Sequence, residues 1–300
     1  MQKDIKRQIE DIVGDGNVYE NELMAPHMSM KVGGYADLYV TPSSAEQIKE
    51  LMKLFRIEDV PYYVLGNGTN VIIRDEGYRG VIISTREGLR QIRTEGNNIT
   101  AGAGISLKEA AEAACRASLS GMEFASGIPG SLGGAVTMNA GAYDGEMKDI
   151  ITTVYAVDKE GNERIFSAAE ADFSYRHSIF STGEYIVTAA CITLKEGDIS
   201  AIRAKMDELN ARRAEKQPLE YPSCGSTFKR PEGHFAGKLI MDSHLAGARV
   251  GGASVSRKHC GFVINDNNAN AADVLGVIKL VQDTVKEQSG IELECEVRVL

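Results

Sequence analysis

The sequence predicts a protein of mixed helices and strands with two or three domains. Its 300 residues exceed the roughly 100–200 residues of a typical single domain. Segments in which apolar and polar residues alternate, as in strands, recur between segments with an apolar residue every three or four positions, as in helices. With 43% hydrophobic and 25% charged residues, the composition is that of an ordinary globular protein.

The charge and the cysteines exclude several classes of protein. A net charge of −9 argues against nucleic-acid binding, which requires a basic face. The five cysteines are odd in number and widely spaced, so neither a disulfide framework nor a zinc site is expected. Residues 1–13 lack the apolar core of a signal peptide, and no apolar run is long enough to span a membrane. We expect a cytoplasmic monomer without a metal, membrane or nucleic-acid partner.

The expected helices rest on apolar spacing and capping signals. Residues 41–44 start a helix that has Ile48, Leu51, Met52 and Phe55 on one face. A capping box of Ser106 and Glu109 opens another. The helices are expected at residues 1–13, 44–55, 106–121, 199–216, 236–245 and 272–288. Strands are expected at residues 35–40, 61–65, 71–73, 81–84, 99–104, 151–157, 162–166, 185–194, 262–265 and 293–299.

Residues 127–145 hold six glycines among small residues and almost no charge. Glycine permits positive φ and lets backbone N–H groups approach a bulky ligand, and successive exposed amides form anion-binding concavities. The stretch is therefore a candidate cradle for a phosphate-bearing cofactor. Taken alone, it is more typical of a structural loop.

A second glycine-containing turn, Gly-Asn-Gly-Thr-Asn at residues 66–70, follows an expected strand. It can bring backbone amides and the Thr69 hydroxyl to a diphosphate. It is not a Walker loop, because no Gly-Lys-Ser/Thr follows. It is not the dinucleotide fingerprint either, because a strand rather than a helix comes next.

Two further segments place cations among hydroxyl groups. Residues 173–180 surround Arg176 with aromatic and hydroxyl side chains, which fits a semi-buried cation and equally fits an arginine that bridges strands. Residues 221–231 form a hydroxyl-rich turn with two cations. This turn follows Gln217-Pro218, which ends the preceding charged helix and where the composition changes, so a domain boundary is expected there.

Together and in this order, these segments resemble the UDP-N-acetylenolpyruvoylglucosamine reductases, flavin enzymes of bacterial peptidoglycan precursor synthesis. The resemblance covers about residues 20–300. One motif would be weak evidence, but the ordered set is very specific. The motifs are residues 66–70, Gly-Ile-Pro-Gly-Ser-Leu-Gly-Gly-Ala (127–135), Met-Asn-Ala-Gly-Ala-Tyr (138–143), Tyr-Arg-x-Ser-x-Phe (175–180), Gly-Ser-x-Phe-Lys (225–229), Ala-Gly-Lys-Leu-Ile (236–240) and Leu-Glu-x-Glu-Val-Arg (293–298). The chain departs from the family pattern at Met28, Met30, Asp144 and Arg230.

The resemblance implies an α+β protein with the FAD-binding fold of the vanillyl-alcohol-oxidase type and a C-terminal α+β substrate-binding domain. The implied first flavin-binding subdomain, with the N-terminal helix, is residues 1–60. The second is residues 61–198, and the substrate-binding domain is residues 199–300. Because no extra loop is inserted between Arg176 and Ser226, the chain is similar to the shorter subgroup of the family.

The resemblance also implies non-covalent FAD, NADPH and a UDP-sugar substrate. The residues implied to bind the cofactor are Gly66, Asn67, Gly68, Thr69, Asn70, Gly102, Gly127, Pro129, Gly130, Ser131, Gly133, Gly134, Asn139, Ala140 and Gly141. Those implied to bind the substrate are Tyr175, Lys216 and Lys229. Without the resemblance, the two lysines would be interpreted as surface residues.

The implied reaction reduces UDP-N-acetylglucosamine enolpyruvate to UDP-N-acetylmuramate. By match to the family, Arg176 would stabilise the charge that develops beside the substrate carboxylate. Ser226 would donate the proton, and Glu296 would polarise the carboxylate. Without the resemblance, Ser226 is a turn residue and Glu296 a solvent-facing charge on a strand. Two alternatives stay open: a different FAD-dependent oxidase of the same fold, and a non-catalytic sensor of flavin or nucleotide sugar.

Overall fold

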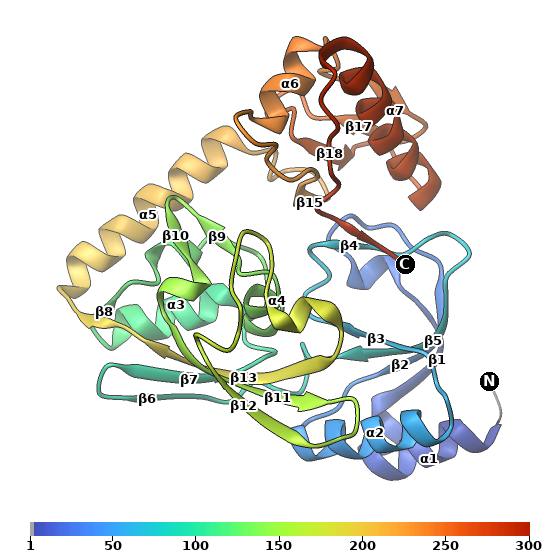
Figure 1. The fold of residues 1–300 in the computed structure, drawn as a ribbon, viewed down its shortest axis with the longest axis vertical. Helices are drawn as coiled ribbons and strands as arrows, with labels where there is room; N and C mark the ends of the chain where they lie inside the picture. The colour runs from blue at the N-terminus through green and yellow to red at the C-terminus, as the bar shows by residue number, and fades with distance from the viewer. Residues whose placement is uncertain (1–2) are drawn as a thin grey trace. The chain divides into compact units, whose positions relative to one another are not determined.

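A computed structural model describes residues 3–300 of the chain (Figure 1). The described residues form two compact units, and each unit combines three segments that are separated in the sequence. The first unit contains residues 3–22, Asp37–Asn67 and Arg79–Arg212, and the second contains Leu23–Ala36, Gly68–Tyr78 and Arg213–Leu300. The boundaries expected after residues 60 and 198 stay predictions.

A four-stranded sheet of order β1-β2-β5-β3 in the first unit is accompanied by the neighbouring helices α1 and α2 (Figure 1). The expected apolar face of α2 is buried at Ile48, Leu51, Met52 and Phe55, which confirms that helix. The helix expected at residues 1–13 is confirmed from Lys3 onward, and its first two positions lie outside the described residues. The elements are α1 (Lys3–Val13), β1 (Val18–Leu23), β2 (Tyr35–Val40), α2 (Ala45–Ile57), β3 (Tyr62–Leu65) and β5 (Tyr78–Ser84).

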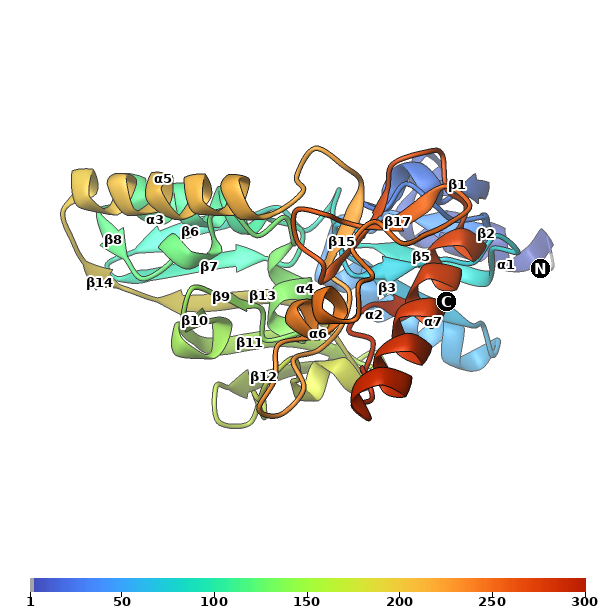
Figure 2. The ribbon, with the colours of Figure 1, turned by 90° about the horizontal axis from the view of Figure 1, so that it is seen from above.

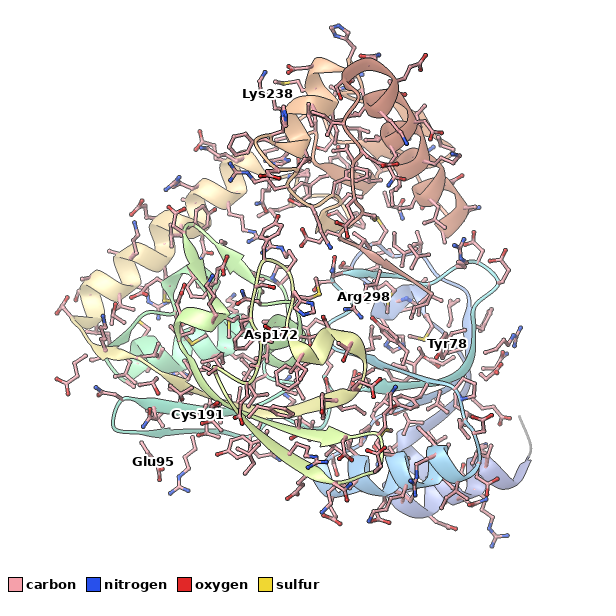
Figure 3. All side chains as sticks on the ribbon, viewed as in Figure 1. Tyr78, Glu95, Asp172, Cys191, Lys238 and Arg298 are labelled. Carbon is pink, nitrogen blue, oxygen red and sulfur yellow. The ribbon has the colours of Figure 1, made fainter. Side chains whose placement is uncertain are left out.

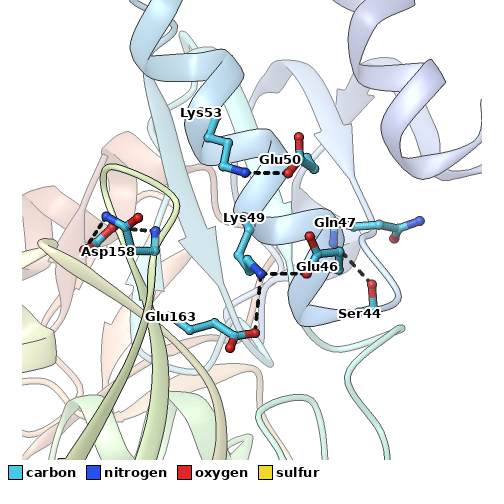
Figure 4. Close-up of polar contacts among 9 residues, drawn as sticks. Ser44, Glu46, Gln47, Lys49, Glu50, Lys53, Asp158 and Glu163 are labelled. Atoms are coloured by element: carbon cyan, nitrogen blue, oxygen red, sulfur yellow. Dashed lines mark hydrogen bonds and ion pairs between the residues drawn. The ribbon is translucent and has the colours of Figure 1, made fainter.

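Polar contacts at the start of α2 connect it to a neighbouring strand, β12 (Glu163–Ser167) (Figure 4). The Ser44 hydroxyl accepts a hydrogen bond from the Gln47 N–H at 3.2 Å and caps the helix. Lys49 Nζ lies 2.7 Å from Glu46 Oε2 and 3.6 Å from Glu163 Oε1. Because the two glutamates are largely exposed, water and salt screen the pairs, and they contribute little to stability.

The second sheet of the first unit is antiparallel and has the order β12-β11-β13-β7-β6. Its outer hairpin turns at Gly161, as expected from the Gly-Asn signal. Helices α3 and α5 lie side by side along this sheet in Figure 2. The bounds are β6 (Ile92–Glu95), β7 (Asn98–Gly102), α3 (Leu107–Arg116), β11 (Ile151–Asp158), β13 (Tyr185–Thr193) and α5 (Ile199–Lys216).

Two short strand pairs complete the first unit. The capping box of Ser106 and Glu109 is confirmed, but α3 ends at Arg116 rather than at Gly121. It ends early because Ser118 has a positive φ of 56° and the chain then enters β8 (Leu119–Ser120). β8 pairs with β14 (Lys195–Glu196), and β9 (Gly141–Ala142) pairs with β10 (Gly145–Glu146).

A bidentate ion pair joins α5 to α3. Arg203 donates hydrogen bonds of 2.7 and 2.6 Å to the two carboxylate oxygens of Glu112. The hydrogen bond from Arg203 is the main cause that lowers the pKa of the Glu112 carboxyl below its usual value of 4.5.

We expect Glu112→Gln to lower the urea midpoint of unfolding at pH 7. The folded-state pKa is lowered, so the stabilisation is complete above the unfolded-state pKa and is lost as pH falls through the folded-state pKa. The midpoints of wild type and variant should therefore differ at pH 7 and converge as the pH falls below 4.5 and through the lowered folded-state pKa. A constant difference between them from pH 7 to pH 3 would contradict the proposed contribution of the ionised pair.

The second unit contains a sheet of order β15-β18-β17-β16 against which α7 packs (Figure 1). Its core joins Met30, Val32 and Ile72 to apolar residues of the C-terminal segment. The helix expected at 272–288 is confirmed, and Gly290 ends it with a left-handed φ of 72°. The elements are β4 (Val71–Ile72), β15 (Ser223–Ser226), α6 (Ala236–Asp242), β16 (Arg249–Val250), β17 (Ala253–Val255), β18 (Phe262–Asn265), α7 (Ala271–Ser289) and β19 (Arg298–Val299).

The strand expected at residues 293–299 is wrong over most of its length. Only Arg298–Val299 form a strand, β19, which pairs in parallel with β4. Upstream of it, Cys295 makes a single antiparallel bridge to Phe228. The alternation of apolar and polar residues predicted an extended segment, but it could not predict which residues of that segment pair with another strand.

Asp75 caps α7 from a distant part of the chain. Its two carboxylate oxygens accept hydrogen bonds from the N–H groups of Ala271 (2.8 Å) and Ala272 (2.9 Å). Both N–H groups belong to the first turn of the helix, where they lack an intrahelical partner and where negative charge is favourable.

We expect Asp75→Ala to reduce the free energy of unfolding by about 1–2 kcal/mol, because one capping carboxylate satisfies two otherwise unpaired N–H groups. Chemical denaturation monitored by circular dichroism measures this loss. Asp283→Ala is the matched control, because Asp283 is an exposed residue of the same helix and forms an ion pair with Lys279 one turn away. Equal losses in the two variants would contradict the capping role.

Charged side chains such as Glu95 and Lys238 are exposed to solvent (Figure 3), and so are some large apolar side chains such as Ile57 and Ile165. Within residues 3–300, no helix combines the length and the apolar character needed to cross a membrane. The same residues contain no group of three or more His, Cys, Asp or Glu side chains arranged to hold a metal ion.

Candidate active site

Three glycine-containing segments meet within the first unit. Asn67 Nδ2 donates to the Pro129 carbonyl at 2.9 Å, and a Cβ on Gly66 would lie 2.3 Å from Ser131 Oγ. These contacts place the end of β3 against the glycine-rich stretch. Parts of residues 66–70 and 127–145, which the resemblance assigns to one cofactor, are therefore in contact in the structure.

The third segment, residues 102–107, lies along the same stretch. The Gly133 N–H donates to the Ala103 carbonyl at 2.9 Å, and the Leu132 N–H donates to the Ile105 carbonyl at 2.7 Å. Gly133 is buried, and a Cβ there would lie 2.8 Å from the Ala103 Cβ. Glycine is required at 133 because the two backbones approach too closely for a side chain.

Part of the glycine-rich stretch is helical, which the sequence did not predict. Residues Leu132–Thr137 form α4, and the Ser131 hydroxyl caps it by accepting from the Gly134 N–H. Leu132, Ala135 and Val136 are buried, so this helix contributes to the core. Gly134 is exposed, and the nearest atom to a Cβ there would be Ser131 Oγ at 3.4 Å.

The backbone donors of this region fit a phosphate-bearing cofactor. Across the described chain, the N–H groups of Gly66, Asn67, Gly130 and Ser131 donate to no other residue. In the second unit, the N–H groups of residues 68–70 and the Thr69 hydroxyl are likewise without a partner among residues 3–300. Unused backbone donors beside glycines are the donor set that a diphosphate requires.

Asn139 follows α4, is fully buried and uses its side chain on protein groups. Asn139 Nδ2 donates to the Ser174 carbonyl at 2.9 Å and to Glu146 Oε2 at 3.0 Å, and its Oδ1 accepts from the Lys148 N–H at 2.9 Å. Because the side-chain amide is used on protein groups, only the backbone of Asn139 is left for the predicted contact with a flavin. Ala140 and Gly141 continue the chain into β9.

Arg176 lies in a tight turn of the first unit. Reciprocal hydrogen bonds join Ser174 to His177, at 3.1 and 3.2 Å, so Tyr175 and Arg176 occupy the two central positions. Arg176 has a positive φ of 55°, is half-buried, and lies 5.1 Å from the centre of the exposed Tyr175 ring. Asp172, labelled in Figure 3, belongs to the same loop.

Ser226 and Glu296 lie on neighbouring segments of the second unit. The Glu296 N–H donates to the Thr227 carbonyl at 2.8 Å, and the Lys229 N–H donates to the Glu294 carbonyl at 2.8 Å. Asn70 Nδ2 donates to the Glu296 carbonyl at 3.2 Å. The structure therefore brings together three sequence-predicted positions: Asn70, Ser226 and Glu296.

The side chains around Ser226 differ in their access to solvent. Ser226 is exposed and Glu296 is half-buried. Burial raises the pKa of the nearby Cys224 thiol to about 12, and its Sγ faces the Val71 carbonyl at 3.7 Å. That thiol is therefore buried and stays protonated at neutral pH, whereas the Ser226 hydroxyl is accessible to solvent.

The two predicted substrate lysines have different surroundings. Lys229 forms an ion pair of 2.5 Å with Glu294. Lys216 is exposed at the C-terminal end of α5. The partner of Lys229 is therefore Glu294 and not the proposed catalytic residue Glu296.

Comparison with known proteins decides the family. Residues 217–300 match the UDP-N-acetylenolpyruvoylglucosamine reductase C-terminal domain, and residues 36–167 match the FAD binding domain. The UDP-N-acetylenolpyruvoylglucosamine reductase of Clostridium novyi (strain NT) is 48% identical over 99% of this chain and 96% of its own length. This chain belongs to the UDP-N-acetylenolpyruvoylglucosamine reductase family. The Caldanaerobacter subterraneus reductase is also 48% identical, over 98% of this chain and 97% of that protein.

Solved structures confirm the α+β fold class with its FAD-binding and C-terminal domains. The Thermus caldophilus UDP-N-acetylenolpyruvylglucosamine reductase aligns with a TM-score of 0.80 and 36% identity, over 93% of this chain and 97% of that one. A glucose dehydrogenase, Phl p 4.0202, aligns with a TM-score of 0.52 and 14% identity over 66% of this chain and 45% of its own, which shows a shared fold alone. This chain therefore has the FAD-binding fold of the reductase family.

Proposed function

We propose that this chain reduces UDP-N-acetylglucosamine enolpyruvate to UDP-N-acetylmuramate, in peptidoglycan precursor synthesis, with FAD as cofactor and NADPH as reductant. The observation that carries the proposal is the nearly full-length relationship to proteins named for this reductase activity. We further propose that the protein acts on its UDP-sugar substrate as a monomer in the cytoplasm. All five cysteines are unpaired, which suits a reducing compartment.

FAD would be held non-covalently by backbone groups. The unused N–H groups of Gly66, Asn67, Gly130 and Ser131 in the first unit suit its diphosphate. Gly68, Thr69 and Asn70 are proposed contacts by match to the family. The remaining proposed contacts are those of Gly102, Gly127, Pro129, Gly133, Gly134, Ala140 and Gly141, together with the backbone of Asn139. When bound, FAD supplies the hydride that NADPH provides.

The side chains of this chain would manage charge and a proton on the substrate. Hydride addition at the distal carbon of the enolpyruvyl group leaves carbanion character at the carbon beside the carboxylate. Arg176 is permanently charged and planar, so it suits the carboxylate and the negative charge developing next to it. In this role it lowers the barrier only if its position is fixed before reaction.

Ser226 would donate its hydroxyl proton to that carbon. A serine hydroxyl is a weak acid, but a carbanion is a strongly basic acceptor, and general-acid assistance of this kind contributes about 10²–10⁴-fold to rate. Glu296, on the adjoining segment, would hydrogen-bond the carboxylate when protonated, or through a water molecule. Tyr175, Lys216 and Lys229 would bind the remainder of the substrate, with the lysines attracting its diphosphate.

The purified protein tests this proposal directly. We expect a yellow protein with a flavin absorption spectrum, and NADPH oxidation that depends on the enolpyruvyl sugar. A colourless protein that takes up no FAD would contradict flavin binding. NADPH oxidation by a yellow protein that ignores the enolpyruvyl sugar would instead indicate an oxidase or another flavoenzyme of this fold.

A further inference from the structure

We propose that Asn139 is a positioning residue for the reaction: it clamps the turn that presents Arg176. The inference rests on the proposed role of Arg176. It assigns the Asn139 side chain to the substrate half of the reaction rather than to the flavin.

The clamp reaches the turn at its first residue. Asn139 Nδ2 donates to the Ser174 carbonyl at 2.9 Å, and the same carbonyl accepts the His177 N–H that closes the turn, at 3.2 Å. The other contacts of the amide, to Glu146 Oε2 and the Lys148 N–H, fix its orientation on the β9–β10 side. Because Asn139 has no exposed surface, its removal leaves the Ser174 carbonyl, Glu146 and the Lys148 N–H without these buried hydrogen bonds.

The turn needs such a support because its backbone is unfavourable for arginine. A positive φ at the second central position favours glycine or asparagine, and other residues lose roughly 1–2 kcal/mol there. Arg176 adopts this conformation at φ 55°. Asn139 itself has a φ of 42°, a conformation that asparagine tolerates well.

Electrostatics ties the clamp to the arginine as well. The hydrogen bond from Lys148 is the main cause that lowers the pKa of the Glu146 carboxyl, and burial opposes it. The Asn139 hydrogen bond and the positive charges of Lys148 and Arg176 lower this pKa further. The ionised Glu146 therefore faces both Asn139 and the field of Arg176. A loosened clamp would let the guanidinium move, and a displacement of about 1 Å can cost ~10²-fold in rate.

The test is a double-mutant cycle on the two half-reactions. Asn139→Gly removes the side chain but tolerates the left-handed backbone. Asn139→Asp keeps size and shape but loses both donors and places a carboxylate against Glu146. In each we expect reduction of the flavin by NADPH at the wild-type rate. Oxidation of the reduced flavin by the enolpyruvyl substrate should slow by about tenfold, against about a hundredfold for Arg176→Ala. Hydrogen exchange of the peptide containing residues 174–177 should accelerate in both Asn139 variants.

The double variant decides between the explanations. If Asn139 acts through Arg176, then adding N139G to R176A should change the reoxidation rate by less than about twofold. Ser178→Ala is the control: it removes a buried 2.8 Å bond between the same loop and the Thr137 carbonyl without touching Asn139, and should alter reoxidation by less than about threefold.

Additive effects of N139G and R176A would overturn the positioning role while leaving the role of Arg176 intact. Unchanged reoxidation in N139G and N139D would overturn it too. An unchanged rate in R176A would reject the role of Arg176 itself, and the inference with it. Loss of bound flavin in N139D would return Asn139 to the cofactor site.

Discussion

Replacing Ser226 by alanine is expected to slow reduction of the enolpyruvyl substrate by about a thousandfold, within the range of a lost general acid. Reduction of the flavin by NADPH should continue at the wild-type rate, because the proposed Ser226 proton is needed only after hydride reaches the substrate. The exposed position of Ser226 makes a folding defect from this change small. Stopped-flow absorbance of the flavin measures the two half-reactions separately.

Ser223→Ala is the matched control for this experiment. Ser223 lies on the same strand, β15, and the substitution removes one hydroxyl three residues away. We expect both half-reactions of this variant to stay within about twofold of wild type. Equal loss of flavin reduction and substrate reduction in Ser226→Ala would contradict the proton-donor role and indicate a binding or folding role.

Leucine at position 134 is expected to weaken FAD binding by at least about a hundredfold, or about 2.7 kcal/mol. Gly134 is exposed on α4 between two proposed cofactor contacts, so a large side chain would occupy the space beside the unused backbone donors. Because a Cβ at this position meets nothing closer than 3.4 Å, the apoprotein should fold normally. Titration of apoprotein with FAD, followed by fluorescence, measures the change.

The adjacent glycines supply the controls. Gly134→Ala should bind FAD and gain up to about 1 kcal/mol in stability, because alanine favours helix more than glycine. Gly133→Ala should instead lose about 1–3 kcal/mol in the apoprotein, since its Cβ would lie 2.8 Å from that of Ala103. A Gly134→Leu protein that stays fully yellow and active would show that this part of the cradle does not contact the cofactor.

The helices were predictable where sequence signals agreed. In α2, α5 and α7, apolar spacing, capping residues or breakers indicate the same limits, and the structure confirms them. Helix α4 was not predictable, because its two glycines disfavour helix and its six residues carry no amphipathic period. It forms because Ser131 caps it and because Leu132 and Val136 are buried.

The candidate site could be predicted as segments but not as contacts. The glycine-containing segments were expected to meet, and the first unit joins them through Asn67, Ser131 and Gly133. The neighbouring positions of Ser226 and Glu296 depend on pairing across some seventy residues, which no local pattern encodes. The Asn139 clamp was also missed, because its partners Glu146 and Ser174 are identified only by the tertiary fold.

The interleaved division of the chain has a consequence for biosynthesis. The polypeptide passes between the two units five times, after residues 22, 36, 67, 78 and 212. Met30, Val32 and Ile72 therefore leave the ribosome long before Val274 and Val281, with which they share a core. At ordinary translation rates these apolar segments wait about 200 residues, or roughly 10–40 s, for their partners. A nascent chain that stops near residue 212 would lack the partners of these apolar segments. Because the segments of the two units alternate along the chain, neither unit can be isolated by a single truncation.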